Sequence, residues 1–600
     1  MGVVGQETAR ESRRVWLGRT LDELTPLGAV ALGLALGAIS VGIYIADGYS
    51  KSMLWLWLGG LTFAAIGFGL RARVWPRIAL LDVGLAAGAS ALCAPLYLIA
   101  IYRWPVQVGS DEIAIMQVSK QSASIPHLDP FGASFYLTRP AMLFIVWGKL
   151  GNLIGGIDLF HMRLLHAFVG LLTVAACYVL FRLVRLPRGW ALFAAVLVGA
   201  SHSMFMISRL AMRENTSVLF LVVALSLLVW GLQNAQELAT FLGGVVAGLG
   251  FYVYEPGRIA FPIWIVFLIG LALLYRQRFP GRSLLRAAAI TTAGFVLVAT
   301  PIVYSQAKVP GTQQTAQQTG LFIYNTAREE QKTWVAADSQ WSGWWKNVRH
   351  GLGTFNDGVV DHSWTYANYG HGFVDPLTGI VLWLGVGLTA VALVRRRAEP
   401  EALLMLSGFL VLWLSLAFLI NKAPNYTRLL VTLPFVAYLV TQAVRWLAGR
   451  WRSLRFGPQA VVGAFAVAFI ALNLSIAWDY IQDGRRAGEA IGSTGRYIDS
   501  HQNIPGEHFY VASSDSSPYY VWGDTSATSG RMQAFLPKSQ FPGLVDPAAL
   551  KDFQAAPPFS LFMRREIWAG ASAELATRFP RGRLRNVTPD GARVVLEVPS

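Results

Sequence analysis

The stretch Ala79–Tyr102, ALLDVGLAAGASALCAPLYLIAIY, carries a single charged residue, Asp82. A helix over this run rises about 1.5 Å per residue and is long enough to cross about 30 Å of hydrocarbon. The run is followed by a polar break, Gly109-Ser110-Asp111-Glu112, in which two acids adjoin. Because charges are costly near a bilayer, this pair marks a candidate functional site beside a membrane span.

Apolar runs of similar length recur along most of the chain and predict an α-helical polytopic membrane protein. Of the 600 residues, 54% are hydrophobic and 14% are charged, whereas a soluble protein of this length needs far more charge to cover its surface. We expect about thirteen membrane spans. The candidate spans are 26–46, 53–71, 79–102, 162–184, 190–207, 215–232, 238–255, 258–275, 286–304, 376–394, 402–420, 427–447 and 458–479.

The basic residues behind the formal net charge of +16 cluster in short loops between these spans. Under the positive-inside rule, the loops and the N-terminal segment 1–25 face the cytoplasm, which indicates a multi-pass protein of a bacterial-type plasma membrane. This distribution argues against nucleic acid as a partner. The basic loops contain Arg71, Arg73 and Arg77; Arg182, Arg185 and Arg188; Arg276, Arg278 and Arg282; Arg395–Arg397; and Arg445, Arg450, Arg452 and Arg455.

This topology gives a transmembrane domain over residues 26–479 with two long outer loops, 103–161 and 305–375. Within the first loop, residues 140–156 are apolar enough to resemble a span. Counting them as a span would move every later basic loop to the opposite face. We therefore expect an interfacial helix there, lying in the plane of the membrane surface.

Residues 480–600 have the composition of a soluble domain. Three short segments, 509–512, 559–563 and 592–598, are typical of strands, and helical stretches lie between them. The sequence therefore predicts a small extracytoplasmic α/β domain at the C-terminal end of the bundle.

Three acids at the outer face are candidates for catalysis: Asp111, Glu112 and Glu214. A carboxylate in a loop that leaves a membrane span can act as general base on an acceptor hydroxyl held beside an electrophile. The alternative for Asp111 and Glu112 is a solvated loop or a helix N-terminus, where acids are favoured. The alternative for Glu214 is an ion pair with Arg209 or Arg213.

Six arginines lie near the outer face, against the positive-inside trend, and each therefore needs an anionic partner. Guanidinium groups bind phosphate through two parallel hydrogen bonds, which favours a phosphate-bearing lipid substrate. The alternatives are membrane lipid headgroups and ion pairs with acids such as Glu214 and Glu255. The candidates for phosphate binding are Arg139, Arg163, Arg209, Arg213, Arg258 and Arg428.

Neither a metal centre nor a disulfide framework is indicated. The two cysteines, Cys93 and Cys177, lie in apolar runs and are expected to be buried small side chains. The histidines lack the tight spacing of metal ligands. The less favoured alternative is an outer-face metal site built from Asp357, Asp361, His362 and His371.

Several outer-face motifs follow one another along the chain: Asp111-Glu112, Thr138-Arg139-Pro140, SRLAMRE (208–214), GFYVYEPGR (250–258) and APNYTR (423–428). Their order resembles the polytopic glycosyltransferases of the C-type fold, specifically the protein-mannosyltransferase group that includes the aminoarabinose transferase of lipid A. The resemblance covers roughly residues 79–450. Two departures are a glutamate at position 214, where many members carry aspartate, and the lack of the Trp-Trp-Asp-Tyr-Gly motif of oligosaccharyltransferases.

The resemblance implies a sugar donor carried on polyprenyl phosphate, an active site at the outer face, inversion at the anomeric carbon, and no metal or other cofactor. It implies that Asp111 is the base that activates the acceptor, that Glu112 supports it, and that Arg139 contacts the donor phosphate. The acceptor is a protein, a lipid or a glycan.

Two other classes of protein fit the composition. A flippase of lipid-linked sugars predicts ionisable residues at span midpoints and paired half-structures, whereas the acids here lie at the outer ends of the spans and no internal repeat is present. A non-catalytic envelope scaffold leaves Asp111, Glu112 and the outer arginines without a role. A membrane glycosyltransferase is therefore the favoured interpretation.

Overall fold

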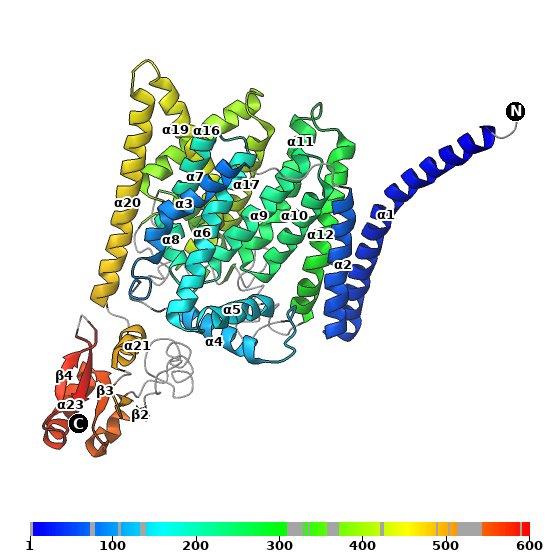
Figure 1. Cartoon of the computed structure of the whole chain (residues 1–600). Coiled ribbons are helices and arrows are strands. Elements are labelled where there is room, and N and C mark those ends of the chain that lie inside the picture. The colour runs from blue at the N-terminus through cyan, green and yellow to red at the C-terminus, as the bar shows by residue number, and fades with distance from the viewer. Residues whose placement is uncertain are drawn as a thin grey trace.

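Helices run side by side as one bundle, and a small sheet domain lies beyond one end of it (Figure 1). This arrangement confirms the predicted fold class, an α-helical polytopic membrane protein with a small C-terminal α/β domain. The computed structural model describes residues 4–71, 79–105, 108, 110–132, 140–308, 328–329, 332–333, 336–356, 371–420, 425–487, 490–501, 504–512, 543–588 and 591–600.

Except for α15, a polar helix within the predicted outer loop 305–375, the bundle helices follow the apolar runs of the sequence, with short 3-10 turns where the chain changes direction. The helices are α1 (Val4–Asp47), α2 (Lys51–Leu70), α3 (Leu80–Leu98), α6 (Leu159–Leu183), α7 (Arg188–Ala200), α8 (His202–Ser208), α9 (Glu214–Gln233), α10 (Glu237–Leu249), η1 (Gly250–Tyr252), η2 (Glu255–Ile259), α11 (Ala260–Leu274), α12 (Gly281–Lys308), α15 (Gln340–Gly353), α16 (Pro376–Val394), α17 (Pro400–Phe418), α18 (Tyr426–Leu429), η4 (Leu430–Thr432), α19 (Leu433–Arg450) and α20 (Gly457–Ala487).

Ten helices of the described chain are long and apolar enough to cross a membrane, and the pair α7–α8, bent by 57°, counts as an eleventh if it forms one span. The sequence predicts about thirteen. The other two predicted spans correspond to shorter apolar helices, Glu237–Tyr252 and Pro400–Leu416. Each predicted span therefore coincides with an apolar helix or helix pair, and the numbers differ because two of these helices are short.

Burial separates central from peripheral spans. In the span Tyr426–Arg450, 89% of the most apolar window is buried inside the protein, against 22% for α3 and 28% for α20. The first of these spans is therefore a core element, whereas α3 and α20 expose most of their apolar surface to the surrounding lipid.

Small residues bring α1 and α2 into close contact at the N-terminal edge of the bundle. A methyl group added at Gly33 would lie 2.2 Å from the backbone nitrogen of Ala64, so no larger residue fits there. Close backbone approach at glycine is a common way for helices to associate in lipid. The hairpin is fastened to the bundle by the indole of Trp57, which donates to the carbonyl of Leu297 on α12 at 2.9 Å.

Two helices lie across one end of the bundle, α4 (Ser110–Ser124) and α5 (Ala141–Ile154) (Figure 1). α5 buries Phe144 and Trp147 against its neighbours, while Leu153 on the same helix is 80% exposed. A short helix that is apolar on an exposed side fits a position at the membrane surface. The structure thus places a helix, Ala141–Ile154, where the sequence predicts one, and its interfacial position stays a prediction.

The C-terminal domain is a five-stranded mixed sheet in the order β2-β1-β3-β5-β4. β1 pairs parallel with β2 and β3, and β5 pairs antiparallel with β3 and β4. The elements are α21 (Ala490–His501), β1 (His508–Ala512), β2 (Gly543–Val545), η5 (Pro547–Asp552), β3 (Phe559–Arg564), α23 (Arg565–Arg578), β4 (Arg583–Asn586) and β5 (Arg593–Val598).

Sequence patterns predict three of these strands and miss two. β2 is only three residues long, and all four residues of β4, Arg-Leu-Arg-Asn, are exposed, so neither strand has an apolar pattern. The predicted boundary at 479–480 also falls inside α20, which continues to Ala487.

The sheet domain touches the first outer loop. The Arg496 guanidinium of α21 donates to the carbonyl of Tyr102 at 3.5 Å and to that of Pro105 at 3.4 Å. The domain therefore lies at the same end of the bundle as α4 and α5.

Candidate active site

A fully buried ion pair fixes the first outer loop. Arg163, near the start of α6, donates from Nε to Glu112 Oε1 and from Nη2 to Glu112 Oε2, each at 2.9 Å, and both side chains are 0% exposed. Its Nη1 donates to the carbonyls of Ile101 at 3.3 Å and Pro105 at 2.9 Å. Arg163 therefore holds both α4 and the end of the preceding loop against α6, through the bidentate geometry that makes such pairs strong.

Glu112 also reaches a third segment. Its Oε1 accepts a hydrogen bond from the backbone nitrogen of Ala211 at 2.8 Å, in the short connection between α8 and α9. A buried carboxylate is tolerated only when hydrogen bonds and an opposite charge replace its water. Glu112 has both, and it thereby joins the first turn of α4 to α6 and to the α8–α9 connection.

Asp111 precedes Glu112 in the first turn of α4. It is half-buried, whereas Glu112 is fully buried. Adjacent residues of an α-helix project about 100° apart, so the Asp111 side chain leaves the helix in a different direction from the carboxylate paired with Arg163. The structure places the two predicted acids in different surroundings, one inside the protein and one beside its partly open surface.

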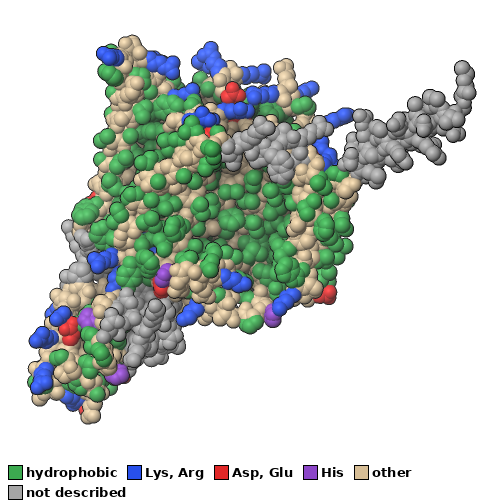
Figure 2. Space-filling view, viewed as in Figure 1, with side chains coloured by type: hydrophobic (Ala, Val, Ile, Leu, Met, Phe, Trp, Pro, Cys, Tyr) green, Lys and Arg blue, Asp and Glu red, His purple; other side chains and the backbone are tan. Residues whose placement is uncertain are grey.

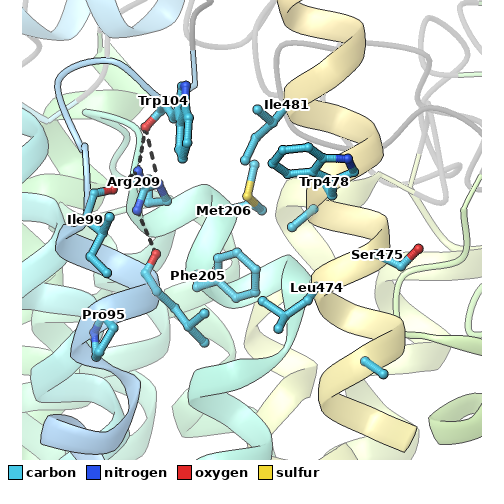
Figure 3. A pocket seen from close by; sticks show the side chains of 13 residues that line it. Pro95, Ile99, Trp104, Phe205, Met206, Arg209, Leu474, Ser475, Trp478 and Ile481 are labelled. Carbon is cyan, nitrogen blue, oxygen red and sulfur yellow. Dashed lines mark hydrogen bonds between the residues drawn. The ribbon is translucent and has the colours of Figure 1, made fainter.

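Arg209 caps the end of α3. It donates from Nη1 to the carbonyl of Leu96 and from Nη2 to that of Ile99, each at 2.7 Å, and from Nη2 to that of Trp104 at 2.9 Å (Figure 3). Burial, together with the positive charge of Arg163, lowers the pKa of Arg209 to about 10, so the group remains protonated at neutral pH. The carbonyls at a helix C-terminus are a favourable site for this charge.

An apolar cavity of about 540 Å³ adjoins Arg209. Figure 3 shows Leu474 and Trp478 of α20 facing Phe205 and Met206 of α8 across it. Since α3 and α20 are the most lipid-exposed of the spans compared above, a hydrocarbon chain is the chemically matched occupant. The lining residues are Pro95, Leu96, Ile99, Trp104, Phe205, Met206, Arg209, Ala471, Leu474, Ser475, Ala477, Trp478 and Ile481.

A second group of arginines lies in the segments that meet at Tyr254. The Arg213 guanidinium carbon lies 5.1 Å from the centre of the Tyr254 ring, a cation–π contact. The Tyr254 hydroxyl is hydrogen-bonded to Thr427 Oγ1 at 3.1 Å, so the GFYVYEPGR and APNYTR segments meet at this point. Arg428 directly follows Thr427 on α18.

Arg258 belongs to the same group. Its guanidinium carbon lies 5.3 Å from the centre of the Phe251 ring, and its charge is close enough to that of Arg213 for the two to repel. Arg258 Nε is buried with no hydrogen-bond partner among the residues that the structure describes. Positive charges held together in this way favour an anion between them.

Glu214 begins α9 beside Arg213 and is only 4% exposed. It occupies the helix N-terminus, where a negative charge is favourable. The structure thus brings Glu214, Arg213, Arg258 and Arg428 to one region. It places Glu112, Arg163 and Arg209 in the neighbouring loop network.

Several residues that sequence patterns do not single out complete this region. Tyr426 donates to Ser203 Oγ at 2.9 Å, which ties α18 to α8. Asn473 of α20 donates to Asp375 Oδ2 at 2.9 Å and accepts from the His202 backbone nitrogen at 2.7 Å. Tyr254 and Thr427 lie within motifs of the resemblance. Asn473 lies in an apolar span, where the polar amide of its side chain is the sequence feature that could have drawn attention to it.

Some predicted positions lie outside the described residues, namely Arg139 and, from the alternative metal site, Asp357, Asp361 and His362. Within the described part of the chain, no group of three or more His, Cys, Asp or Glu side chains is placed to hold a metal ion. Cys93 and Cys177 are buried free cysteines, as the sequence predicts.

Residues 91–309 match the family described as dolichyl-phosphate-mannose-protein mannosyltransferase. No curated protein sequence matches the chain. The matched interval contains the candidate site residues Asp111, Glu112, Arg163, Arg209, Arg213, Glu214 and Arg258. Arg428 lies beyond it.

Solved structures with a similar arrangement share little sequence with this chain. ArnT from Cupriavidus metallidurans bound to undecaprenyl phosphate is 13% identical, with a TM-score of 0.48 over 86% of this chain and 97% of that one. The Archaeoglobus fulgidus oligosaccharyltransferase in its apo form is 13% identical, with a TM-score of 0.48 over 83% and 71%. The Saccharomyces cerevisiae Pmt1–Pmt2 complex bound to the sugar donor is 17% identical, with a TM-score of 0.32 over 43% and 37%.

The family match covers the segment that carries the first outer loop, the Glu112–Arg163 pair and the arginines on either side of Glu214. It confirms the resemblance that the motif order predicts. Over residues 91–309 the chain is therefore similar to the family described as dolichyl-phosphate-mannose-protein mannosyltransferase.

Proposed function

We propose that the protein transfers a sugar from a polyprenyl-phosphate donor to a hydroxyl or amine acceptor at the membrane face that carries α4 and α5. The observation behind this proposal is that Arg213 lies against Tyr254 and close to Arg258, and that Arg428 directly follows Thr427, whose hydroxyl contacts Tyr254. Three guanidinium groups at the outer end of a membrane bundle suit the phosphate of a lipid-linked sugar. The description of the matched family names a donor of this class, a sugar carried on a lipid phosphate.

The apolar cavity gives the donor's hydrocarbon chain a place next to these arginines. Arg209 lines the cavity, and Arg213 follows it by four residues, which span at most about 14 Å even when extended. A lipid whose chain lies between α3 and α20 would thus have its phosphate near Arg213. The segment 209–213 would thus contact both parts of the lipid substrate, the hydrocarbon chain near Arg209 and the phosphate near Arg213.

The proposed reaction is an inverting displacement. Asp111 takes the proton of the acceptor hydroxyl or amine, the acceptor atom forms its bond to the anomeric carbon, and the bond from that carbon to the phosphate oxygen breaks. Polyprenyl phosphate leaves with the bonding electrons, and Arg213, Arg258 and Arg428 stabilise the added negative charge. Glu214 is a second acid near this phosphate site, and the acceptor is a protein, a lipid or a glycan.

We assign Arg163 and Arg209 a positioning role instead of the phosphate contacts predicted for them. Arg163 donates to Glu112 and to two backbone carbonyls, and Arg209 donates to three backbone carbonyls. A phosphate would have to displace those partners. We likewise propose that Glu112 has a supporting role, because its hydrogen bonds hold the turn that carries Asp111. Arg139 remains a predicted phosphate ligand.

Binding of polyprenyl phosphate to the purified protein in nanodiscs tests the phosphate site. Replacing Arg213, Arg258 or Arg428 with alanine removes charge-assisted hydrogen bonds, and we expect affinity to fall roughly 10- to 100-fold. Lysine at the same position keeps the charge but loses the bidentate geometry, so its effect should be intermediate. Arg349→Ala, on the exposed side of α15, is the matched control. Unchanged binding in all three alanine variants would refute the phosphate site.

A further inference from the structure

The end of the bundle opposite α4 and α5 holds a second, very different cavity. It has a volume of about 810 Å³ and lies where α6, α11, α16, α17 and α19 end or begin. Figure 2 shows Lys and Arg side chains gathered over this end of the molecule. Five arginines and one glutamate line the cavity: Arg185, Arg278, Arg395, Arg397, Arg445 and Glu399.

These arginines come from separate connections in the chain. Arg185 follows α6, Arg278 follows α11, Arg395 and Arg397 follow α16, and Arg445 is in the last turns of α19. The positive-inside rule explains why arginines occur at this face, but it does not bring three loops and the end of α19 to a common cavity. We infer that this cavity is a binding site for a phosphate-bearing headgroup, separate from the proposed active site at the other end.

The charges within the cavity are only partly balanced. Arg278 Nη1 lies 3.2 Å from Glu399 Oε2, and Arg185 Nε lies 3.5 Å from Glu401 Oε1. Glu401 also accepts from Gln233 Nε2 at 2.6 Å. Arg395, Arg397 and Arg445 form no ion pair with any residue in the described ranges. The cavity therefore carries an excess of positive charge that an anion would neutralise.

One further observation indicates a ligand. Thr389 lines the cavity, is 5% exposed, and its hydroxyl has no hydrogen-bond partner among the described residues. Such a buried hydroxyl normally has a partner, and a headgroup oxygen would supply one.

The remaining walls match the neck of a lipid. Leu388, Val391 and Trp446 provide apolar surface, while Tyr438 and Gln442 are polar groups on α19. Guanidinium groups around a phosphate, with apolar side chains below them, are the arrangement that basic pockets between membrane helices offer to anionic lipids. A free phosphate-bearing molecule would use the same arginines but not the apolar wall.

The test measures lipid binding to the full chain in detergent with two double variants. Arg397→Gln with Arg445→Gln removes two cavity charges. Arg452→Gln with Arg455→Gln removes the same net charge from the exposed α19–α20 loop and serves as the control. We expect the cavity variant to bind phosphatidylglycerol or cardiolipin at least about tenfold more weakly, while the control changes less than about twofold.

Inorganic phosphate distinguishes the two sources of the ligand. If the site takes a lipid headgroup, millimolar phosphate should compete poorly with the anionic lipid. If it takes a soluble phosphate compound, phosphate should bind to the wild type, compete fully, and bind less well to the cavity variant. Equal affinity for phosphatidylcholine and phosphatidylglycerol, or equal losses in the two double variants, would overturn the proposal. Polyprenyl phosphate binding at the opposite end should be unchanged in both variants.

Discussion

The two ends of the bundle use arginine differently. At the end with α4 and α5, the Arg163 and Arg209 side chains are buried and already hydrogen-bonded to Glu112 and to backbone carbonyls. At the other end, Arg395 and Arg397 face a cavity and form no ion pair within the described chain. A buried arginine that is already paired holds loops in place. An arginine that faces a cavity and forms no ion pair is available to a ligand. Charge alone therefore does not identify a binding residue; its local partners do.

The adjacent acids differ in the same way: Glu112 is buried and paired, whereas Asp111 is only half-buried. Replacing Asp111 should have the largest effect that we predict. Asp111→Asn keeps the shape of the side chain and removes its basicity. Loss of a positioned general base should reduce the rate of sugar transfer by about 10²–10⁴-fold. The measurement is turnover of a polyprenyl-phosphate sugar by protein in nanodiscs. Polyprenyl phosphate affinity is the control and should be retained. Near-normal turnover would remove Asp111 from the proposed mechanism and leave Glu214 as the acid to examine.

Glu112→Gln should act on stability. The substitution leaves the Arg163 charge buried without its carboxylate, and breaking a buried pair in this way costs about 3–5 kcal/mol. We expect a lower thermal unfolding midpoint in detergent and loss of ordered structure in α4, with activity falling in parallel. Full stability combined with a selective loss of turnover would instead give Glu112 a chemical role and weaken the distinction between the two acids.

Arg209→Met should have the smallest effect of the three. It removes hydrogen bonds to the carbonyls at the end of α3, and unsatisfied buried carbonyls cost about 1–3 kcal/mol. We expect a modest decrease in the unfolding midpoint and a less than tenfold change in polyprenyl phosphate affinity. A loss of affinity as large as that expected for Arg213→Ala would place Arg209 among the phosphate ligands.

Much of the fold could be predicted because membrane spans are defined by the length and composition of single segments. The bend between α7 and α8 could not, because it is accompanied by a hydrogen bond from the His202 backbone to Asn473, far along the chain. The membrane side of the later basic loops predicted an interfacial helix over residues 140–156 in place of another span. Strands β2 and β4 were missed because they are short or exposed, and their pairing is set by the rest of the sheet.

The candidate site shows the same limit. Sequence patterns selected Asp111, Glu112 and the outer arginines by residue type and membrane face. They did not show that Arg163 would pair with Glu112, 51 residues away, because pairing depends on how α4 and α6 pack. Nor did they single out Tyr254 and Thr427, whose hydroxyl contact joins segments 173 residues apart. The residue type at each position indicated the chemistry that it could perform. The division into positioning and binding residues required the contacts seen in the structure.

The carbonyl of Pro105 accepts hydrogen bonds from both Arg163 and Arg496. One peptide group is therefore a mechanical joint between the sheet domain and the turn that carries Asp111, with only Arg163 and Glu112 between them. The sheet domain and the turn that carries the proposed base are thus connected through two arginines, Arg496 and Arg163.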